Sequence, residues 1–293
     1  MRGALVLGDL CLDVDVEQGS RHGYQFEARS LRLCPAGSGG NFAIALSSTG
    51  LDAVIASPVS RDPVLSLLRS MMGVLGVRLE EIHGNGGTCT IVNIYRAGRP
   101  RRAYYHAGPR ASIRGVVERL TVMAEELGHL HITGYLLELV PPIEVEPLLS
   151  RDRGYTVSID LHPRAGALGG ELPSILEKAD YVMGTTRELR SLGQRLGQTA
   201  RTLVEKGAKC VVAKSGALGA RAYCRDGAYK ARPPRVEPVM LKGAGDVLAA
   251  YFIAGVALGK SHRESLEDAV KMAAEHVAGR GPLNKAWSKA SAT

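Results

Sequence analysis

Short apolar runs alternate with amphipathic stretches along the chain, which is the pattern of an α/β protein. The apolar runs predict buried strands at residues 4–7, 52–57, 129–133, 156–160, 181–184, 210–216 and 220–223. Apolar positions at helical spacing predict helices at residues 42–50, 64–75, 116–127, 246–258 and 263–278. Because strands and helices alternate repeatedly, we predict a mainly parallel sheet that is covered by helices on both faces.

Two stretches interrupt this alternation. Residues 88–95 and 101–105 have the pattern of a β-hairpin around a Gly-Arg-Pro turn, and residues 24–33 alternate loosely, as a short covering strand would. We therefore predict one large domain over residues 1–293, with segments of a small additional sheet inserted near 13–33 and 86–107.

The composition fits a soluble globular enzyme of 293 residues, 45% hydrophobic and 5% aromatic. No apolar run approaches the ~18 residues of a membrane span, and the start of the chain lacks a signal-peptide pattern, so we expect a cytoplasmic protein without a membrane partner. The cysteines are widely spaced, odd in number and form no Cys-x-x-Cys pair. We expect them to be reduced, buried residues rather than disulfides or zinc ligands.

The net charge of +8 raises the question of a nucleic-acid partner. The one dense basic run, Arg96 to Arg110, is interrupted by Tyr104-Tyr105-His106. Such a segment suits a single-stranded nucleic acid, a small phosphorylated or acidic ligand, or a solvated hairpin. We rank nucleic acid last among these three.

A glycine turn at residues 243–246 leads directly into an apolar helix. Free backbone N–H groups and the positive end of the helix dipole then point at one spot, and Asp246 places a carboxylate beside them. The amides suit a transferring phosphoryl group, and Asp246 suits the removal of a proton from an attacking hydroxyl. Taken alone, the pattern fits equally well a simple turn in which the aspartate caps the helix.

Other polar positions follow predicted strands or open predicted helices. Asp13 lies just beyond the first strand, where open parallel sheets place their ligands. The glycine-rich segment 35–41 ends at Asn41 and allows either a close approach of backbone to ligand or an ordinary capped helix. His129 and His131 are two residues apart without a third ligand nearby, which favours a structural role over a metal site.

Residues 254–261 satisfy a relaxed form of the phosphate-binding P-loop pattern. A true P-loop follows a strand and opens a helix, whereas this match lies inside a predicted helix and at its end, with Gly259 in the C-cap position. We therefore expect Lys260 to be a surface residue that contacts no phosphate.

In this order, the segments resemble those of the ribokinase-like (PfkB) family of sugar and nucleoside kinases over nearly the whole chain. The turn at 243–246 is similar to the family signature, and residues 35–41 resemble its glycine-rich sugar-binding motif. Three further segments are similar to the family's first strand, its Asn-x-x-Glu motif and its Thr-x-Gly-x-x-Gly motif: residues 8–13, 185–188 and 214–219. The resemblance implies a three-layer α/β/α fold with a mainly parallel central sheet and a small β-sheet lid.

The resemblance also implies an activity, the ATP- and Mg²⁺-dependent phosphorylation of a hydroxyl of a small sugar-like substrate. Asp246 would be the general base, and the amides of Gly243, Ala244 and Gly245 would form the anion hole. The residues implied for the substrate are Asp13, Gly37, Ser38 and Asn41, and those implied for the nucleotide are Thr185, Lys214, Gly216 and Gly219. Glu188 would organise Mg²⁺ through water, and the lid would exclude water from the reaction.

The chain departs from the family pattern at several of these positions. Met240, Leu241 and Lys242 stand where Asp-Thr-x is usual, Thr185 replaces the usual Asn, and Lys214 replaces the usual Thr. We expect Lys242, next to the anion hole, to stabilise the transferring phosphate in part. The departures also keep open a second interpretation, a non-catalytic sugar- or nucleotide-binding protein on the same fold.

Two segments bear on the substrate. Tyr104 to His106 and Asp160 to Arg164 are similar to segments of 2-keto-3-deoxygluconate kinases, although His106 and His162 differ from the usual residues. This resemblance adds Tyr104, His106, Asp160 and Arg164 to the substrate candidates. A sugar acid is thus one candidate among hexoses, pentoses and nucleosides, and a homodimer formed through the lid is left open.

Overall fold

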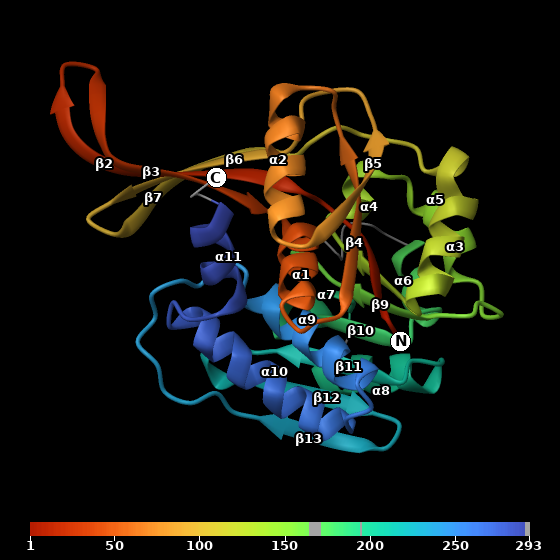
Figure 1. Cartoon of the computed structure of the whole chain (residues 1–293). Coiled ribbons are helices and arrows are strands. Elements are labelled where there is room, and N and C mark those ends of the chain that lie inside the picture. Colours follow the sequence, from red (N-terminus) through yellow and green to blue (C-terminus); the bar gives the residue numbers. More distant parts are fainter. Residues whose placement is uncertain (164–170, 194, 291–293) are drawn as a thin grey trace.

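The computed structural model describes residues 1–163, 171–193 and 195–290, and within them the chain forms a large sheet of nine strands (Figure 1). Their order is β13-β12-β11-β10-β9-β8-β1-β4-β5. The strands are β1 (Gly3–Leu7), β4 (Asp52–Val59), β5 (Val77–His83), β8 (His129–Thr133), β9 (Thr156–Asp160), β10 (Tyr181–Thr185), β11 (Cys210–Lys214), β12 (Ala220–Cys224) and β13 (Gly227–Ala231). All neighbours from β5 to β11 are parallel, whereas β12 and β13 pair antiparallel, so the prediction of a mainly parallel sheet is confirmed.

Helices cover both faces of this sheet because alternate residues of each strand point to opposite sides. In β1, Ala4 and Val6 pack in one apolar cluster and Leu5 and Leu7 in the other. The first cluster includes α1 (Ser38–Ser47), α2 (Pro63–Val74), α9 (Ala244–Ala257), α10 (His262–Val277) and α11 (Pro282–Ala290). The second includes α3 (Val117–Leu127), α4 (Leu136–Leu139), α5 (Pro142–Val145), α6 (Glu171–Glu177), α7 (Thr186–Ser191) and α8 (Leu196–Glu205). The result is the predicted three-layer α/β/α arrangement.

A second sheet of four strands, in the order β3-β2-β6-β7, extends from the body as an arm (Figure 1). Its strands are β2 (Cys11–His22), β3 (Gln25–Ala36), β6 (Thr90–Arg96) and β7 (Arg99–His106). The short strand expected at 24–33 is therefore part of a longer pair, in which β2 binds β3 on one edge and β6 on the other. Every residue of β7 and the first eight of β3 are exposed, so the outer part of the arm has no core of its own.

The prediction that all cysteines are reduced is wrong for four of them. Cys11 is bonded to Cys89, and Cys210 to Cys224, while Cys34 is free and buried. Strand pairing is the physical reason, because Cys210 and Cys224 stand opposite each other in the β11–β12 ladder. Separations of 78 and 14 residues along the chain gave no sign of either contact.

His129 and His131 form a polar network inside the molecule. The side chain of Ser158 lies 2.7 Å from a ring nitrogen of each histidine, and the other nitrogen of His129 lies 2.7 Å from Thr156 Oγ1. Phe42 stacks on His131 at a centroid distance of 3.6 Å. Burial lowers the pKa of His129 to about 3, so the ring is neutral in the folded protein. The predicted structural role of both histidines is confirmed.

The P-loop-like segment forms the end of α9 and the turn after it. Gly259 has a φ of 81°, as expected for a residue that ends a helix. The Lys260 side chain is 46% exposed and lies 2.6 Å from Asp268. The prediction that Lys260 is a surface residue is thus confirmed. None of the helices in the described part of the chain has the length and apolar character needed to cross a membrane.

Candidate active site

A cavity of about 940 Å³ opens where strands of the large sheet end. The last residues of β8, β9, β10 and β11, which are Thr133, Asp160, Thr185 and Lys214, all line it. The rest of its wall comes mainly from the turn before α9, from α9 and α10, and from the segment that follows β13. Open parallel sheets bind ligands beyond the carboxyl ends of their strands, so this cavity is the candidate site.

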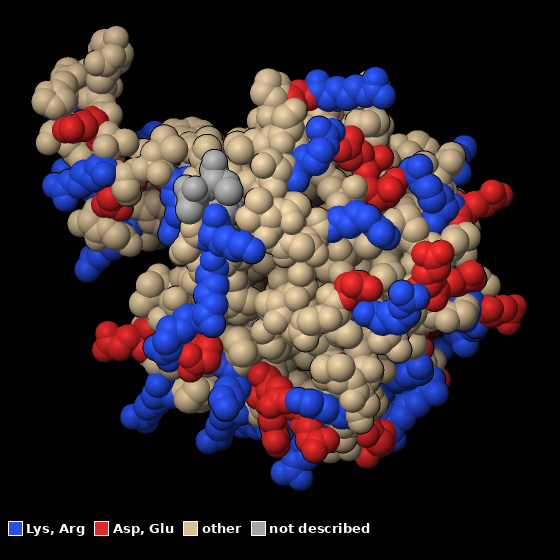
Figure 2. Space-filling view, viewed as in Figure 1, with Lys and Arg blue, Asp and Glu red and all other residues tan. Residues whose placement is uncertain are grey.

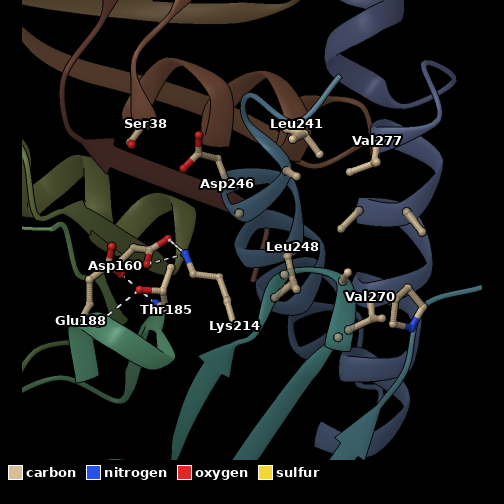
Figure 3. A pocket seen from close by; sticks show the side chains of 18 of the residues that line it. Ser38, Asp160, Thr185, Glu188, Lys214, Leu241, Asp246, Leu248, Val270 and Val277 are labelled. Atoms are coloured by element: carbon tan, nitrogen blue, oxygen red, sulfur yellow. Dashed lines mark hydrogen bonds and ion pairs between the residues drawn. The ribbon is translucent and has the colours of Figure 1, made fainter. Parts of the chain in front are cut away.

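A buried ion pair lies at the sheet end of the cavity (Figure 3). Lys214 Nζ is 2.7 Å from Asp160 Oδ1 and 2.6 Å from Asp160 Oδ2. Burial opposes the charge on Lys214, but the carboxylates of Asp160, Asp246 and Glu188 outweigh it and raise the pKa of Lys214 above its usual value. Lys214 therefore brings a fixed positive charge to the wall of the cavity.

The turn before α9 presents backbone donors to the same space. Gly243 has a φ of 81°, and α9 begins at the next residue. The Ala244 amide donates to the carbonyl oxygen of Leu241 at 3.3 Å, so this member of the predicted anion hole already has a partner. Within the described residues, the amides of Gly245 and Asp246 donate to no backbone oxygen. A Cβ at Gly245 would lie 3.5 Å from Lys214 Nζ, which places the ammonium group beside these donors.

Asp246 lies in the first turn of α9 and reaches the cavity across from Ser38 (Figure 3). Its Oδ2 accepts a hydrogen bond of 2.8 Å from Asn41 Nδ2, on α1. Burial raises the pKa of Asp246 to about 7, against the lowering effect of Lys214 and Asn41. A carboxylate that titrates near neutrality and is held by a side-chain amide has the properties of a general base.

Contacts with Asp9 explain why the segment at 35–41 is rich in glycine. Sequence analysis did not identify this role of Asp9. Its carboxylate accepts hydrogen bonds from the amides of Ser38 at 3.0 Å and Gly39 at 3.3 Å, at the N-terminus of α1. Gly37 has a φ of 86°, and a Cβ there would lie 2.6 Å from the Asp9 carbonyl oxygen. The glycines therefore allow α1 to pack against the turn after β1. This contact places Asn41 opposite Asp246.

Lys242 does not line the cavity, contrary to the role expected from its position. Its ammonium group pairs with Asp13 and lies 3.2 Å from Asp15, on strand β2. Asp15 also accepts hydrogen bonds from Arg32 at 3.0 Å and Asn93 at 2.9 Å. Lys242 thus joins the arm to the turn before α9, because its side chain reaches two carboxylates whose position the sequence could not show.

Two buried oxygen atoms near this junction have no hydrogen-bond partner within the described residues. They are Oδ1 of Asp13 and Oδ1 of Asn41, on the other side of the carboxyl or amide group from the bonded atom. A buried acceptor without a donor is costly, typically about 1–3 kcal/mol. Both residues are candidates for substrate binding, and a ligand hydroxyl would supply the missing donor.

The two C-terminal helices, α10 and α11, contact the glycine turn before α9. A ring nitrogen of His276, on α10, donates to the carbonyl oxygen of Lys242 at 2.6 Å. A Cβ at Gly243 would lie 2.5 Å from a methyl group of Leu283, so α11 packs directly on this glycine. The Trp287 indole N–H donates to a backbone carbonyl near the end of β3 at 3.0 Å. These contacts fix the turn relative to the arm.

Thr185 and Glu188 form a capping box at the start of α7. The Thr185 hydroxyl accepts from the Glu188 amide at 3.2 Å, and Glu188 Oε2 accepts from the Thr185 amide at 2.7 Å. Both residues line the cavity on the side of Asp160 (Figure 3). One oxygen of Glu188, Oε2, is therefore used in holding the start of the helix, whereas Oε1 takes no part in the capping box.

The opposite end of the cavity is apolar. Leu248 from α9 and Val270, Ala273, Ala274 and Val277 from α10 form one wall (Figure 3). Pro233, Pro234, Val236 and Pro238, after β13, and the two predicted glycines, Gly216 and Gly219, complete it. Arg235, from the same segment, also lines the cavity. Gly219 has a φ of 86°, and a Cβ there would lie 2.1 Å from a carbonyl oxygen of β13, so no other residue fits.

Some predicted residues lie elsewhere. Tyr104 and His106 are exposed residues of β7 and do not line the cavity. The predicted residues Gly37, Asp13, Asn41 and Gly243 do not line it either. Arg164 lies outside the described residues. Thr133 and Tyr135 line the cavity although sequence analysis did not select them, and Thr133 follows from the rule that the last residue of a parallel strand faces the ligand.

Comparison with known proteins places this geometry in a family. Residues 1–289 match the family described as pfkB family carbohydrate kinase. A 5-dehydro-2-deoxygluconokinase of Clostridium perfringens is 33% identical over 109 residues, which are 35% of this chain and 32% of that protein. The alignment thus spans about a third of that relative.

Two further similarities cover most of the chain. A 2-dehydro-3-deoxygluconokinase of Thermoproteus tenax is 26% identical over 260 residues, which are 84% of this chain and 80% of that protein. The crystal structure of a ribokinase from Thermotoga maritima covers 100% of this chain and 99% of its own, with a TM-score of 0.78 and 19% identity. This structural likeness establishes the ribokinase-like fold.

Proposed function

Because the chain belongs to the pfkB family of carbohydrate kinases, we propose that it transfers the terminal phosphoryl group of ATP to a hydroxyl of a small sugar-like substrate. The observation that carries this proposal is the position of Asp246. Its half-buried carboxylate, whose pKa is about 7, follows directly on the amides of Gly245 and Asp246, which have no backbone acceptor within the described residues. A base beside an anion hole is the arrangement that phosphoryl transfer to a hydroxyl requires.

The cavity fits a nucleoside triphosphate in size and in polarity. Its volume of about 940 Å³ lies at the upper end of the usual range for small-molecule sites. The apolar wall formed by Leu248, Val270 and Val277 suits a nucleobase, and the other end offers Lys214 and the α9 amides to the phosphates. We propose that the nucleotide lies along this axis.

Carboxylate oxygens line the part of the cavity where the phosphates would lie, and such hard donors fit Mg²⁺. We propose that Glu188 holds the ion through water, because one of its oxygens is not used in the capping box. When bound, the ion would neutralise negative charge on the phosphates. Asp160 contributes less to this site, because Lys214 occupies both of its oxygens.

In the proposed mechanism, Asp246 accepts the proton of the attacking hydroxyl, and Asn41 orients the carboxylate for this role. The amides of Gly245 and Asp246 stabilise the transferring phosphoryl group, with the Lys214 charge beside them. The free oxygen atoms of Asp13 and Asn41 accept hydrogen bonds from substrate hydroxyls. The four-stranded arm acts as a lid that excludes water and thereby limits hydrolysis of ATP.

We propose a sugar acid as the substrate. The relatives in Clostridium perfringens and Thermoproteus tenax are both named as kinases of dehydro-deoxygluconate compounds, which supports this choice over hexoses, pentoses and nucleosides. The test is ADP release with ATP, Mg²⁺ and a panel of sugar acids, sugars and nucleosides. We expect turnover with a sugar acid. Tight sugar binding without any ADP release would instead support the non-catalytic binding protein.

Small molecules are better partners for this surface than nucleic acid. Figure 2 shows basic and acidic side chains interspersed over the face that it presents, whereas a nucleic-acid site gathers basic residues on one surface.

We also propose a homodimer formed through the arm, because Tyr24, Phe26 and Leu31 are 88%, 47% and 60% exposed on it. Light scattering should give twice the mass of one chain, and Leu31→Lys should reduce it. We propose that the enzyme acts in the cytoplasm.

A further inference from the structure

A cluster of metal-binding side chains lies at the turn between β12 and β13. A Cys224 sulfur, an Asp226 carboxylate oxygen and a His262 ring nitrogen all lie within 4.8 Å of one another. None of these residues lines the cavity. We propose that they form, together with Cys210, a Zn²⁺ site that is available when the disulfide between Cys210 and Cys224 is reduced.

The types of donor select the ion. Thiolate sulfur, imidazole nitrogen and carboxylate oxygen are the ligands that Zn²⁺ takes in proteins, whereas Mg²⁺ and Ca²⁺ prefer oxygen alone. Cys210 is bonded to Cys224 in this structure, so reduction leaves a second thiol next to the first. The set then has four ligands, the number that structural zinc sites use.

The distances require only small movements. Ligands that are about 2.0–2.3 Å from a tetrahedral zinc lie about 3.3–3.8 Å from one another. The separations among the donor atoms of Cys224, Asp226 and His262 are at most 4.8 Å, so a shift of about 1 Å brings these three donors together. Within the described residues, no other group of three such side chains meets the same limit.

Neighbouring residues hold the histidine in place. The ring of His262 is stacked with that of Phe252, with the ring centroids 6.3 Å apart and the ring planes at 11°. His262 Nδ1 also lies 2.9 Å from Asp226 Oδ1, a contact that the ion would replace. The Tyr181 ring packs edge-on at 6.1 Å. A ligand whose orientation is already fixed loses little freedom when the ion binds. Asp226 has a side chain that is 50% exposed, which gives the ion access from solvent.

Electrons and protons balance in the change between the disulfide form and the zinc-bound form. A dithiol reductant supplies two electrons and two protons, the sulfur–sulfur bond breaks, two thiols form, and the dithiol becomes a disulfide. Zn²⁺ then displaces one proton from each thiol that it binds. In the reverse direction a disulfide oxidant accepts two electrons from the two thiolates and becomes two thiolates, the Cys210–Cys224 bond forms again, and Zn²⁺ is released. One pair of cysteines therefore exists either as a disulfide or as zinc ligands.

The site would connect two elements that meet near the nucleotide end of the cavity. His262 is the first residue of α10, and Val270 and Val277 of the same helix line the apolar wall. Cys224 and Asp226 belong to the hairpin β12–β13, which precedes the wall segment 233–238. Bound zinc would tie the start of α10 to this hairpin.

The test uses the whole chain, reduced with a dithiol that is then removed without oxygen. Zinc is titrated against a coloured chelator, and Co²⁺ serves as an absorbing substitute whose thiolate charge-transfer band reports sulfur ligands. We expect one Zn²⁺ per reduced chain with a Kd below about 1 μM, and none on the oxidised chain. Zinc should also raise the melting temperature of the reduced protein.

Variants separate this site from adventitious binding. Cys224→Ser should abolish the cobalt thiolate band, and His262→Ala should weaken zinc binding at least about tenfold. The matched control is Cys11→Ser with Cys89→Ser, which removes the other disulfide and should leave zinc binding unchanged. Circular dichroism of each variant confirms folding. The proposal is overturned if the reduced chain binds no zinc, if the oxidised chain binds it equally, or if folded His262→Ala binds as the wild type does.

Discussion

The two ends of the cavity hold their side chains in different ways. At the end below the glycine turn, Asp246 is bonded to Asn41, and Lys214 is bonded to Asp160. At the other end, the side chains of Val270 and other apolar residues offer only van der Waals contact. The hydrogen bond and the ion pair at the first end fix the positions of charged groups, whereas the apolar side chains at the other end fix the shape of the cavity. We therefore expect the first end to control the rate of the chemical step and the second to control affinity for the nucleotide.

The largest effect is expected from Asp246→Asn. Loss of a general base typically reduces kcat about 10²–10⁴-fold, and KM should change little because the proton moves in the transition state. Asparagine also caps helices well, so the variant should fold normally. Steady-state kinetics and circular dichroism provide the measurement. A folded variant that keeps more than about a tenth of wild-type kcat would contradict the proposed mechanism.

The pH profile examines the same carboxylate without a mutation. Burial raises the pKa of Asp246 to about 7, and the protonated form cannot accept the substrate proton. The value of kcat/KM should therefore be constant above about pH 8, fall to about half near pH 7, and reach about a hundredth of its maximum at pH 5. Rates measured from pH 5 to 9 check this. A flat profile down to pH 5 would show that another group is the base.

The ion pair at the polar end should matter for stability as well as for the reaction. Lys214→Met leaves Asp160 buried without its partner, which typically lowers the free energy of unfolding by about 3–5 kcal/mol. Adding Asp160→Leu removes the unpaired charge and should restore most of the stability, while kcat stays low because the charge beside the amides is missing. Urea unfolding and kcat are measured for both variants. Equal stability of wild type and single variant would show that the pair is not needed for folding.

A smaller effect is expected at the apolar end. Val277→Ala removes two methyl groups from the proposed nucleobase wall. This loss should weaken nucleotide binding by about 1–2 kcal/mol at most. The KM for ATP should rise about 5- to 20-fold with kcat nearly unchanged. Lys260→Ala is the surface control and should leave both constants within about threefold. If Val277→Ala lowers kcat and leaves KM unchanged, the proposed division between the two ends is wrong.

The smallest effect is expected on the arm. Tyr104 is 57% exposed and lies outside the cavity, so Tyr104→Ala should not affect stability measurably. If the arm closes as a lid, this change should raise the KM for the sugar about threefold and increase ATP hydrolysis without transfer. The ratio of ADP to phosphorylated product measures this leak. If neither Tyr104→Ala nor His106→Ala changes this ratio, the arm does not act as a lid.

The sequence predicted the layers of the fold and the polar end of the cavity because both follow from local rules. Asp160 and Lys214 end parallel strands, and the turn at 243–246 precedes an apolar helix. The strands at the two edges, β5 and β13, were not predicted, because polar side chains on their exposed face hide the alternation.

Contacts between distant residues could not be predicted. Asn41 and Asp246 are 205 residues apart, and Lys242 and Asp13 are 229 apart. The sequence marked each of these residues as notable but not the partner that decides its role. The disulfides were missed for the same reason. The role of Asp9 was missed because its carboxylate accepts hydrogen bonds from the amides of Ser38 and Gly39, and no sequence motif indicates such a contact.

The packing of α11 behind the glycine turn has a consequence for the order in which the protein becomes active during synthesis. Asn41 is made early, but the turn that places Asp246 beside it rests on Leu283 and the arm rests on Trp287. At about 5–20 residues per second, the ribosome needs about 12–50 seconds to travel from residue 41 to residue 287. Until α11 is made, the turn that carries Asp246 lacks the contact with Leu283 that holds it in place. A nascent chain that stalls before α11 already contains every strand of the large sheet, the last of which ends at Ala231, and we expect it to have no activity.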